Sequence, residues 1–132
     1  MQKKGCGAIL FGRRICTTVS YTHLGMGAQT YPHFELLVIN DCSTDRTVEL
    51  VKKIATQDKR VRLISNQKTS GVSYTRKHGL DEARGSWIAI LDSDDAWAPE
   101  KMERQIALQE KTNAELLFTG SAFMDADGQP ID

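Results

Sequence analysis

Three short apolar runs with helical segments between them are the feature that most constrains the fold of this chain. Residues 34–39, 60–65 and 87–91 are rich in residue types that favour β-strands. Between the first two runs, apolar residues recur at helical spacing, at Val48, Val51, Ile54 and Ala55. Between the last two, a helix is expected from Gly71 to about Ala83, with core contacts at Val72, Leu80 and Ala83. This alternation predicts an α/β fold with a mainly parallel sheet and helices on both of its faces.

The run at 87–91 is expected to be a strand buried on both faces, because it is apolar throughout. After it, Pro99 suits the first position of a helix in which Met102 and Ile106 share one face. Residues 114–118 are then expected to form a further strand. A hairpin turn is expected at residues 125–128, Asp-Ala-Asp-Gly.

The composition indicates one globular domain and argues against several classes of protein. A chain of 132 residues can bury a hydrophobic core, and no apolar run approaches the roughly 18 residues that a membrane-spanning helix needs. Lysine plus arginine and aspartate plus glutamate number 17 each, so binding of nucleic acid through phosphate neutralisation is not expected. Three cysteines without metal-ligand spacing are typical of reduced thiols in the cytoplasm.

Carboxylates follow the run at 87–91 at the point where this strand would leave the sheet. Asp92 and Asp94 are two residues apart and can both reach one ion, and paired carboxylates suit a hard divalent cation. A solvated turn whose acids cap the next helix is the alternative. Asp41 also follows a strand, and parallel strands end along one edge of the sheet, so we expect it on the same edge as Asp92. A nucleotide is expected to bind at that edge.

Four sequence blocks follow one another in a specific order. They are residues 38–45, 71–76, 83–95 and 97–101. Together they resemble the nucleotide-sugar-binding half of the family 2 glycosyltransferases, and the resemblance extends from about residue 29 to residue 131. It implies a Rossmann-like GT-A fold and a metal-dependent, inverting transfer of a sugar to an acceptor hydroxyl. The implied donor is a nucleotide sugar, with UDP as the nucleotide expected from the family, and the implied setting is cell-surface polysaccharide synthesis.

The resemblance also implies roles for individual side chains. Asp41 matches the aspartate that accepts a hydrogen bond from uracil, with helix capping as the alternative. Asp94 matches the second carboxylate of the Asp-X-Asp motif, which holds Mn²⁺ or Mg²⁺, and Asp92 matches the first, near the ribose and the ion. Arg76 matches a basic residue near the phosphates, with a solvated helix face as the alternative. Asp95 is expected to support the metal ligands or to cap the next helix.

The N-terminal part departs from the family. The family opens with a strand that ends in Pro-X-Tyr-Asn, whereas residues 8–14 occupy that place without Pro or Tyr-Asn. Ala8–Phe11 is a candidate short strand, but the residues after it lack helical character. We therefore expect residues 1–28 to be an irregular segment in place of the usual first strand and helix. Residues 29–132 are then the nucleotide-sugar-binding part, in which Lys77 stands where the family usually has Asn.

The acceptor side is not assigned to any residue of the chain. In inverting members of the family the general base is an acidic residue well beyond the Asp-X-Asp motif, so it is expected beyond residue 132. His23, His33 and His78 are expected at the surface or in packing. The expected partners are a UDP-sugar and a glycan or lipid-linked acceptor. The expected location is the cytoplasm, with peripheral association of the parent enzyme at the inner face of the membrane.

Two other classes account for part of the pattern. A fragment that keeps only the nucleotide-binding sheet would fold but would bind neither UDP nor Mn²⁺. A phosphoryl-transfer enzyme would use Asp92 as nucleophile and Asp94 as acid or base. That class expects Ser or Thr where Ala96 stands, and it leaves Asp41 unexplained.

Overall fold

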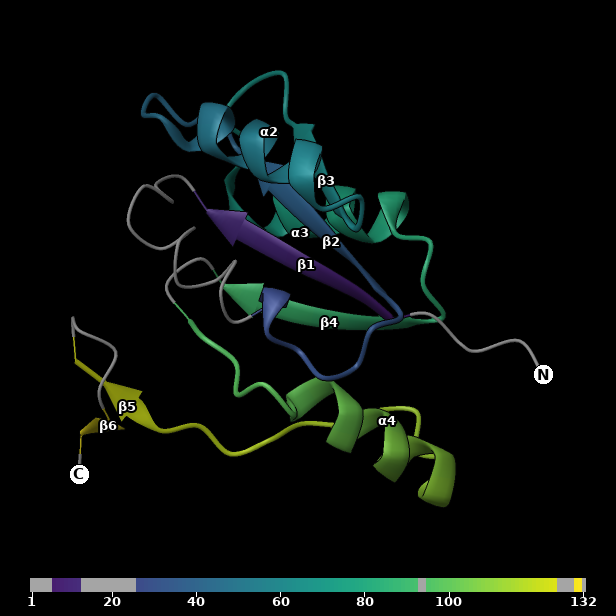
Figure 1. Cartoon of the computed structure of the whole chain (residues 1–132). Helices are drawn as coiled ribbons and strands as arrows, with labels where there is room; N and C mark the ends of the chain where they lie inside the picture. Colours follow the sequence, from purple (N-terminus) through teal and green to yellow (C-terminus); the bar gives the residue numbers. More distant parts are fainter. Residues whose placement is uncertain (1–5, 13–25, 93–94, 126–129, 132) are drawn as a thin grey trace.

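A four-stranded parallel sheet forms the centre of the fold (Figure 1). The structure is a computed structural model that describes residues 6–12, 26–92, 95–125 and 130–131. The strands lie in the order β3-β2-β1-β4, with bounds β1 (Cys6–Gly12), β2 (Phe34–Asn40), β3 (Val61–Ser65) and β4 (Trp87–Asp92). All three neighbouring pairs are parallel, which confirms the predicted sheet.

Helices cover both faces of this sheet, also as predicted. Their bounds are α2 (Thr47–Gln57), α3 (Gly71–Glu82) and α4 (Lys101–Thr112). Val51 of α2 and Met102 of α4 pack with Leu36 in one core cluster. Leu37 points to the opposite face, where Ala83, directly after α3, packs against it. In Figure 1, α2 accordingly lies in front of the sheet and α3 behind it.

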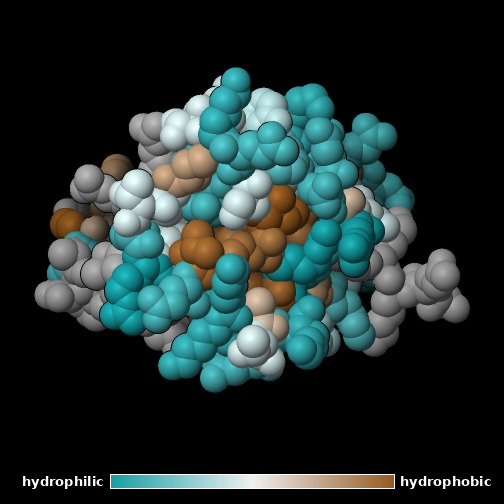
Figure 2. Space-filling view, turned by 90° about the horizontal axis from the view of Figure 1, so that it is seen from above, coloured by the Kyte–Doolittle hydropathy of each residue, from teal (hydrophilic) through white to brown (hydrophobic). Residues whose placement is uncertain are grey.

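Strand β2 is the core of the molecule. Its residues 36–40 are all buried, because β2 has a strand on each side and a helix over each face. The end strand β3 lies nearer the surface, and its residues 62–64 are half-buried. Figure 2 views the molecule from above, the side on which β3 lies in Figure 1. It shows hydrophobic residues gathered at the middle of this face with hydrophilic residues around them.

Strand β4 forms where predicted, but the expectation that it is buried on both faces is wrong. Trp87, Ala89 and Leu91 pack in the core cluster, whereas Ile88 and Ile90 on the other face are exposed. The reason is the position of β4 at an end of the described sheet, beyond the strands β1 and β2 on which α3 packs.

Helix α3 also forms where predicted, but two of its three predicted core contacts are wrong. Val72 and Leu80 are exposed, and the buried residues of α3 are Thr75 and Gly79. Ala83 does pack against the core, as expected. The helix therefore turns a polar residue and a glycine toward the sheet, an orientation that hydrophobic spacing alone does not predict.

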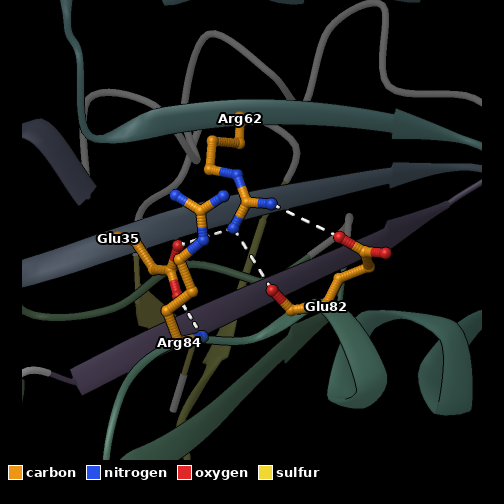
Figure 3. A network of polar contacts seen from close by, with 4 residues as sticks. All are labelled: Glu35, Arg62, Glu82 and Arg84. Carbon is orange, nitrogen blue, oxygen red and sulfur yellow. Dashed lines mark hydrogen bonds and ion pairs between the residues drawn. The ribbon is translucent and has the colours of Figure 1, made fainter.

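A network of charged residues joins the end of α3 to the amino ends of β2 and β3 (Figure 3). Arg62 donates to Glu35 Oε2 at 2.9 Å and to the carbonyl oxygen of Glu82 at 3.2 Å, and it pairs with Glu82 Oε2 at 3.4 Å. Glu35 Oε1 accepts a hydrogen bond from the backbone N–H of Arg84. These contacts hold the C-terminal end of α3 at the amino edge of the sheet. The carboxyl edge, where β2 and β4 end, lies on the opposite side.

The C-terminal region differs from the prediction. Residues 114–118 do not form a strand, and Leu116 and Phe118 are exposed without a neighbouring strand among the described residues. Instead β5 (Phe123–Met124) pairs antiparallel with β6 (Pro130–Ile131). This pairing agrees with a hairpin around the predicted turn, of which residues 126–128 lie outside the described residues.

At the N-terminal end, β1 contains the predicted short strand Ala8–Phe11 and runs between β2 and β4. The segment expected to lack helical character lies largely outside the described residues. The division of the chain at residue 28 stays a prediction. Among the described residues, no helix is long and apolar enough to cross a membrane.

Candidate donor-nucleotide site

Polar side chains gather at the carboxyl edge of the sheet. Asn40 is in register with Ser65 of β3 and with Gly12 of β1, and Phe11 is in register with Asp92. The residues that follow or end these parallel strands therefore lie along one edge, as predicted for Asp41 and Asp92. Asn66, directly after β3, lies on the same edge.

Asp41 is buried at this edge and holds the start of α3. Only 5% of it is exposed, and its carboxylate accepts the backbone N–H groups of Ser70 at 2.8 Å and Gly71 at 3.0 Å. These N–H groups belong to the N-terminal end of α3, where a negative charge is favourable. Gly71 has a φ of +80°, a conformation that a residue with a side chain rarely adopts. Asp41 thus caps a helix 30 residues further along the chain, and its role toward a nucleobase stays a prediction.

Asn66 connects the ends of β2 and β3 to α3. Its backbone N–H donates to the carbonyl of Asn40 at 2.9 Å, and Cys42 Sγ lies 3.4 Å from its carbonyl oxygen. Its side-chain Nδ2 donates to Asp41 Oδ1 at 2.8 Å and to Thr75 Oγ1 at 2.9 Å. Its Oδ1 lies 2.7 Å from His78 Nδ1. Asn66 is only 7% exposed, so these partners satisfy a buried amide.

The loop between β2 and α2 is held by hydrogen bonds between residues that are close in sequence. Asn40 Oδ1 accepts the backbone N–H of Ser43 at 3.0 Å. Asp45 Oδ1 accepts the backbone N–H of Thr47 at 2.9 Å, at the first residue of α2. The Asp45 carboxylate therefore holds a backbone N–H group at the start of α2.

Arg76 and Asp92 form an ion pair across the site. Arg76 Nη2, from the middle of α3, lies 2.8 Å from Asp92 Oδ1 and 3.1 Å from Asp92 Oδ2. Their side chains are 40% and 47% exposed, so the pair is accessible from solvent. Two of the predicted donor-binding residues are thus in direct contact, and the positive charge of Arg76 neutralises the carboxylate of Asp92.

Asp94, the other predicted metal ligand, lies outside the described residues. Asp95 is exposed, and its backbone N–H donates to the carbonyl of Asp92 at 3.1 Å. Among the described residues, no group of three His, Cys, Asp or Glu side chains is arranged to hold a metal ion. Among the described residues, Asp92 is the candidate metal ligand. Its accessible carboxylate oxygens are of the hard type that Mg²⁺ and Mn²⁺ prefer.

Asn66, Thr75 and His78 also belong to this site, although their sequence positions did not predict it. Asn66 could have been noticed, because it follows a strand in the same way as Asp41. His78 was expected at the surface or in packing, and it is half-buried beside the ring of Tyr74. His33 is exposed, and His23 lies outside the described residues.

The fold and the site define a class of protein. The chain has a GT-A fold, shared with the S. aureus TarS fragment 1–349 in complex with UDP-GlcNAc at a TM-score of 0.78 and 23% identity. That likeness covers 83% of this chain and 32% of the TarS fragment. A mannosyltransferase of Pyrobaculum calidifontis, in complex with GDP-Man and Mn²⁺, is similar at a TM-score of 0.75 and 19% identity, over 82% of this chain and 33% of that one.

The model of glycosyl transferase family 2 matches residues 19–127, and the chain belongs to this family. It is 37% identical over 101 residues to the Escherichia coli protein WfgD, a UDP-Glc:alpha-D-GlcNAc-diphosphoundecaprenol beta-1,3-glucosyltransferase. That match covers 76% of this chain and 39% of WfgD. The chain spans about two fifths of the length of several curated relatives it matches.

Proposed function

We propose that the chain forms the donor-nucleotide site of a metal-dependent, inverting glycosyltransferase that uses a UDP-sugar. The observation that carries this proposal is that Asp41 and the ion pair of Arg76 with Asp92 lie along the same carboxyl edge of a parallel sheet. Ligands of open α/β sheets bind at that edge. WfgD, a glucosyltransferase that uses UDP-Glc and a diphosphoundecaprenol-linked sugar, supports the same donor and acceptor classes.

In this proposal, Asp41 selects the base. Its carboxylate is held by N–H groups of Asn66, Ser70 and Gly71, so its orientation is fixed before a ligand arrives. Uracil carries an N–H at position 3 that can donate to such an acceptor, whereas cytosine carries an acceptor there. A fixed carboxylate therefore favours UDP over CDP.

Asp92 and Asp94 would hold Mn²⁺ or Mg²⁺. When bound, the ion supplies Lewis-acid neutralisation of the charge on the departing nucleoside diphosphate. Arg76 is assigned to the phosphates, because its guanidinium already lies at the edge beside Asp92 and suits phosphate oxygens. The general base that deprotonates the acceptor hydroxyl is assigned to a region of the parent protein beyond residue 132.

We assign the parent protein to the cytoplasm, associated peripherally with the inner face of the membrane, where it would act on a glycan or lipid-linked acceptor in polysaccharide synthesis. The acceptor of WfgD, a diphosphoundecaprenol-linked sugar, supports an acceptor presented at a membrane.

The test is a calorimetric titration of UDP into the purified chain, with Mn²⁺ and with a chelator instead. The wild type should bind UDP in a Mn²⁺-dependent way, and Asp94→Asn should weaken binding by about tenfold or more, because a metal ligand is lost. Asp81→Asn is the matched control, because Asp81 is an exposed carboxylate on α3 that pairs with Lys77 away from the edge. It should leave the affinity unchanged.

Each part of the proposal has its own contrary result. Equal UDP affinity with Mn²⁺ and with chelator would reject the metal ion but keep the nucleotide site. A folded chain that binds no UDP in either condition would reject the nucleotide site itself.

A further inference from the structure

A continuous chain of hydrogen bonds runs from His78 of α3 to Asp41. His78 Nδ1 lies 2.7 Å from Asn66 Oδ1, and Asn66 Nδ2 donates to Asp41 Oδ1 at 2.8 Å. The same Nδ2 donates to Thr75 Oγ1 at 2.9 Å. Asp41, Asn66 and Thr75 are buried, so water is largely excluded from these contacts.

The orientation of the Asn66 amide is decided by its partners. The carboxylate of Asp41 receives N–H groups from Ser70 and Gly71, and it requires a donor, Nδ2, on the side of Asn66. Turned by 180°, the amide would set Oδ1 against a carboxylate oxygen. Thr75 does not favour either orientation, because a hydroxyl both donates and accepts.

His78 is the side chain that holds the other end of the same amide, because its Nδ1 faces Asn66 Oδ1. With Asn66 Oδ1 facing it, Nδ1 of His78 carries the hydrogen and donates. His78 is half-buried, and its ring also contacts Tyr74 at a centroid distance of 6.1 Å.

We propose that His78 is a positioning residue of the nucleobase site: it fixes the Asn66 amide, which in turn holds the Asp41 carboxylate in the orientation that favours uracil. This inference rests on the proposed role of Asp41 toward the base. It adds a residue of α3 that does not itself contact the ligand.

Three variants separate the hydrogen bond from simple packing. His78→Leu keeps a side chain of moderate size but removes the donor. His78→Asn retains an amide N–H at about the position of Nδ1 and serves as the conservative rescue. Tyr74→Leu is the matched control, because it removes the ring contact of His78 and leaves the bond to Asn66 in place.

The first measurement needs no ligand. The side-chain amide protons of Asn66 are followed by ¹⁵N NMR, and their exchange with water is measured in each variant. Both protons are hydrogen-bonded in the wild type, so exchange should be slow, and it should become faster in His78→Leu. His78→Asn and Tyr74→Leu should keep the slow exchange of the wild type.

The second measurement is the ratio of UDP to CDP affinity, by calorimetry with Mn²⁺. We expect His78→Leu to lower this ratio by about threefold to tenfold, the effect of weakening one hydrogen bond. His78→Asn should restore the ratio. A merely structural role would lower the amount of folded protein but would leave the ratio unchanged in the molecules that bind.

The outcomes are distinct for the two proposals. Slow exchange of the Asn66 amide in His78→Leu would overturn the role of His78, whatever the nucleotide does. A wild-type preference for UDP that His78→Leu leaves intact would overturn it as well. A wild type that binds UDP and CDP equally would instead reject the proposed role of Asp41, and with it the effect of His78 on the base.

Discussion

At the scale of single residues, the loop that follows β2 is held in an unusual conformation at Cys42. This residue has a φ of +60°, in the left-handed region that costs a residue with a side chain about 1–2 kcal/mol. The conformation directs the chain from the end of β2 toward α2 while Asp41 stays turned toward α3. A contact of Cys42 Sγ with the carbonyl of Asn66 at 3.4 Å accompanies it.

The substitution Cys42→Gly should therefore stabilise the protein. Glycine relieves the steric clash but loses more chain entropy on folding, so we expect a net gain in the free energy of unfolding of about 0.5–1 kcal/mol. Denaturant unfolding measures it. The matched control is Asn113→Gly at the end of α4, where φ is +54° and asparagine tolerates the conformation well. Both substitutions carry the same cost in chain entropy, because both introduce glycine. An equal change in the free energy of unfolding at both positions would therefore show that Cys42 is not strained.

At the scale of elements, α3 is positioned by polar contacts at both of its ends. Asp41 receives the N–H groups of its first turn, and Arg62 and Glu35 hold the chain at its end (Figure 3). Between these ends, Arg76 reaches Asp92 across the sheet edge. The position of the site residues on α3 therefore depends on both groups of contacts.

Replacing Arg62 should destabilise α3 and the fold. In Arg62→Leu, the carboxylate of Glu35, a side chain only 16% exposed, loses its charged partner. We expect the free energy of unfolding to fall by about 1–2 kcal/mol, as for loss of a charged hydrogen bond at a partly buried site. Chemical denaturation followed by circular dichroism is the measurement.

Arg46→Leu provides the comparison, because its ion pair with Glu49 has side chains 71% and 69% exposed. Exposed pairs contribute little, so this change should cost less than about 0.5 kcal/mol. If the two substitutions lowered the free energy of unfolding equally, the network at the end of α3 would contribute no more than an exposed ion pair.

These contacts also explain which parts of the fold could be predicted from sequence. The strand at 34–39 and the helix from Gly71 follow from local patterns, so both were found. The rotation of α3 depends on partners 16 to 30 residues away, as in the pairs Arg76–Asp92 and Gly71–Asp41. Hydrophobic spacing therefore assigned Val72 and Leu80 to the core in error.

The candidate site, like the fold, could be predicted from the sequence only in part. Asp41 and Asp92 could be placed on one edge, because the ends of parallel strands share it. The hydrogen bonds of Asn66 to Asp41 and His78 could not be predicted, because they depend on how closely α3 approaches the end of β3. Residues 114–118 have the composition of a strand, yet a strand needs a neighbour, and the sequence does not say whether one is present.

At the scale of the whole molecule, the described surface carries several large apolar side chains. They include Leu116, Phe118 and Phe123 in the C-terminal region and Ile88 and Ile90 on β4. Apolar residues scattered singly are ordinary on protein surfaces, but those on β4 lie on an end strand of the sheet. No described strand pairs with the outer side of β4, so its backbone groups and its apolar face are both available to a second copy of the chain.

We therefore expect the isolated chain to self-associate as its concentration rises, and the substitution Ile90→Lys to reduce this. A charged side chain on an end strand opposes pairing with another strand. The matched control is Leu108→Lys on α4, because Ile90 and Leu108 are each 48% exposed but a helix offers no unpaired strand edge. Sedimentation velocity over a range of concentrations measures the effect. If both substitutions reduced association equally, exposed apolar area alone would be its cause. If the wild type stayed monomeric at every concentration, the edge of β4 would not be a contact surface.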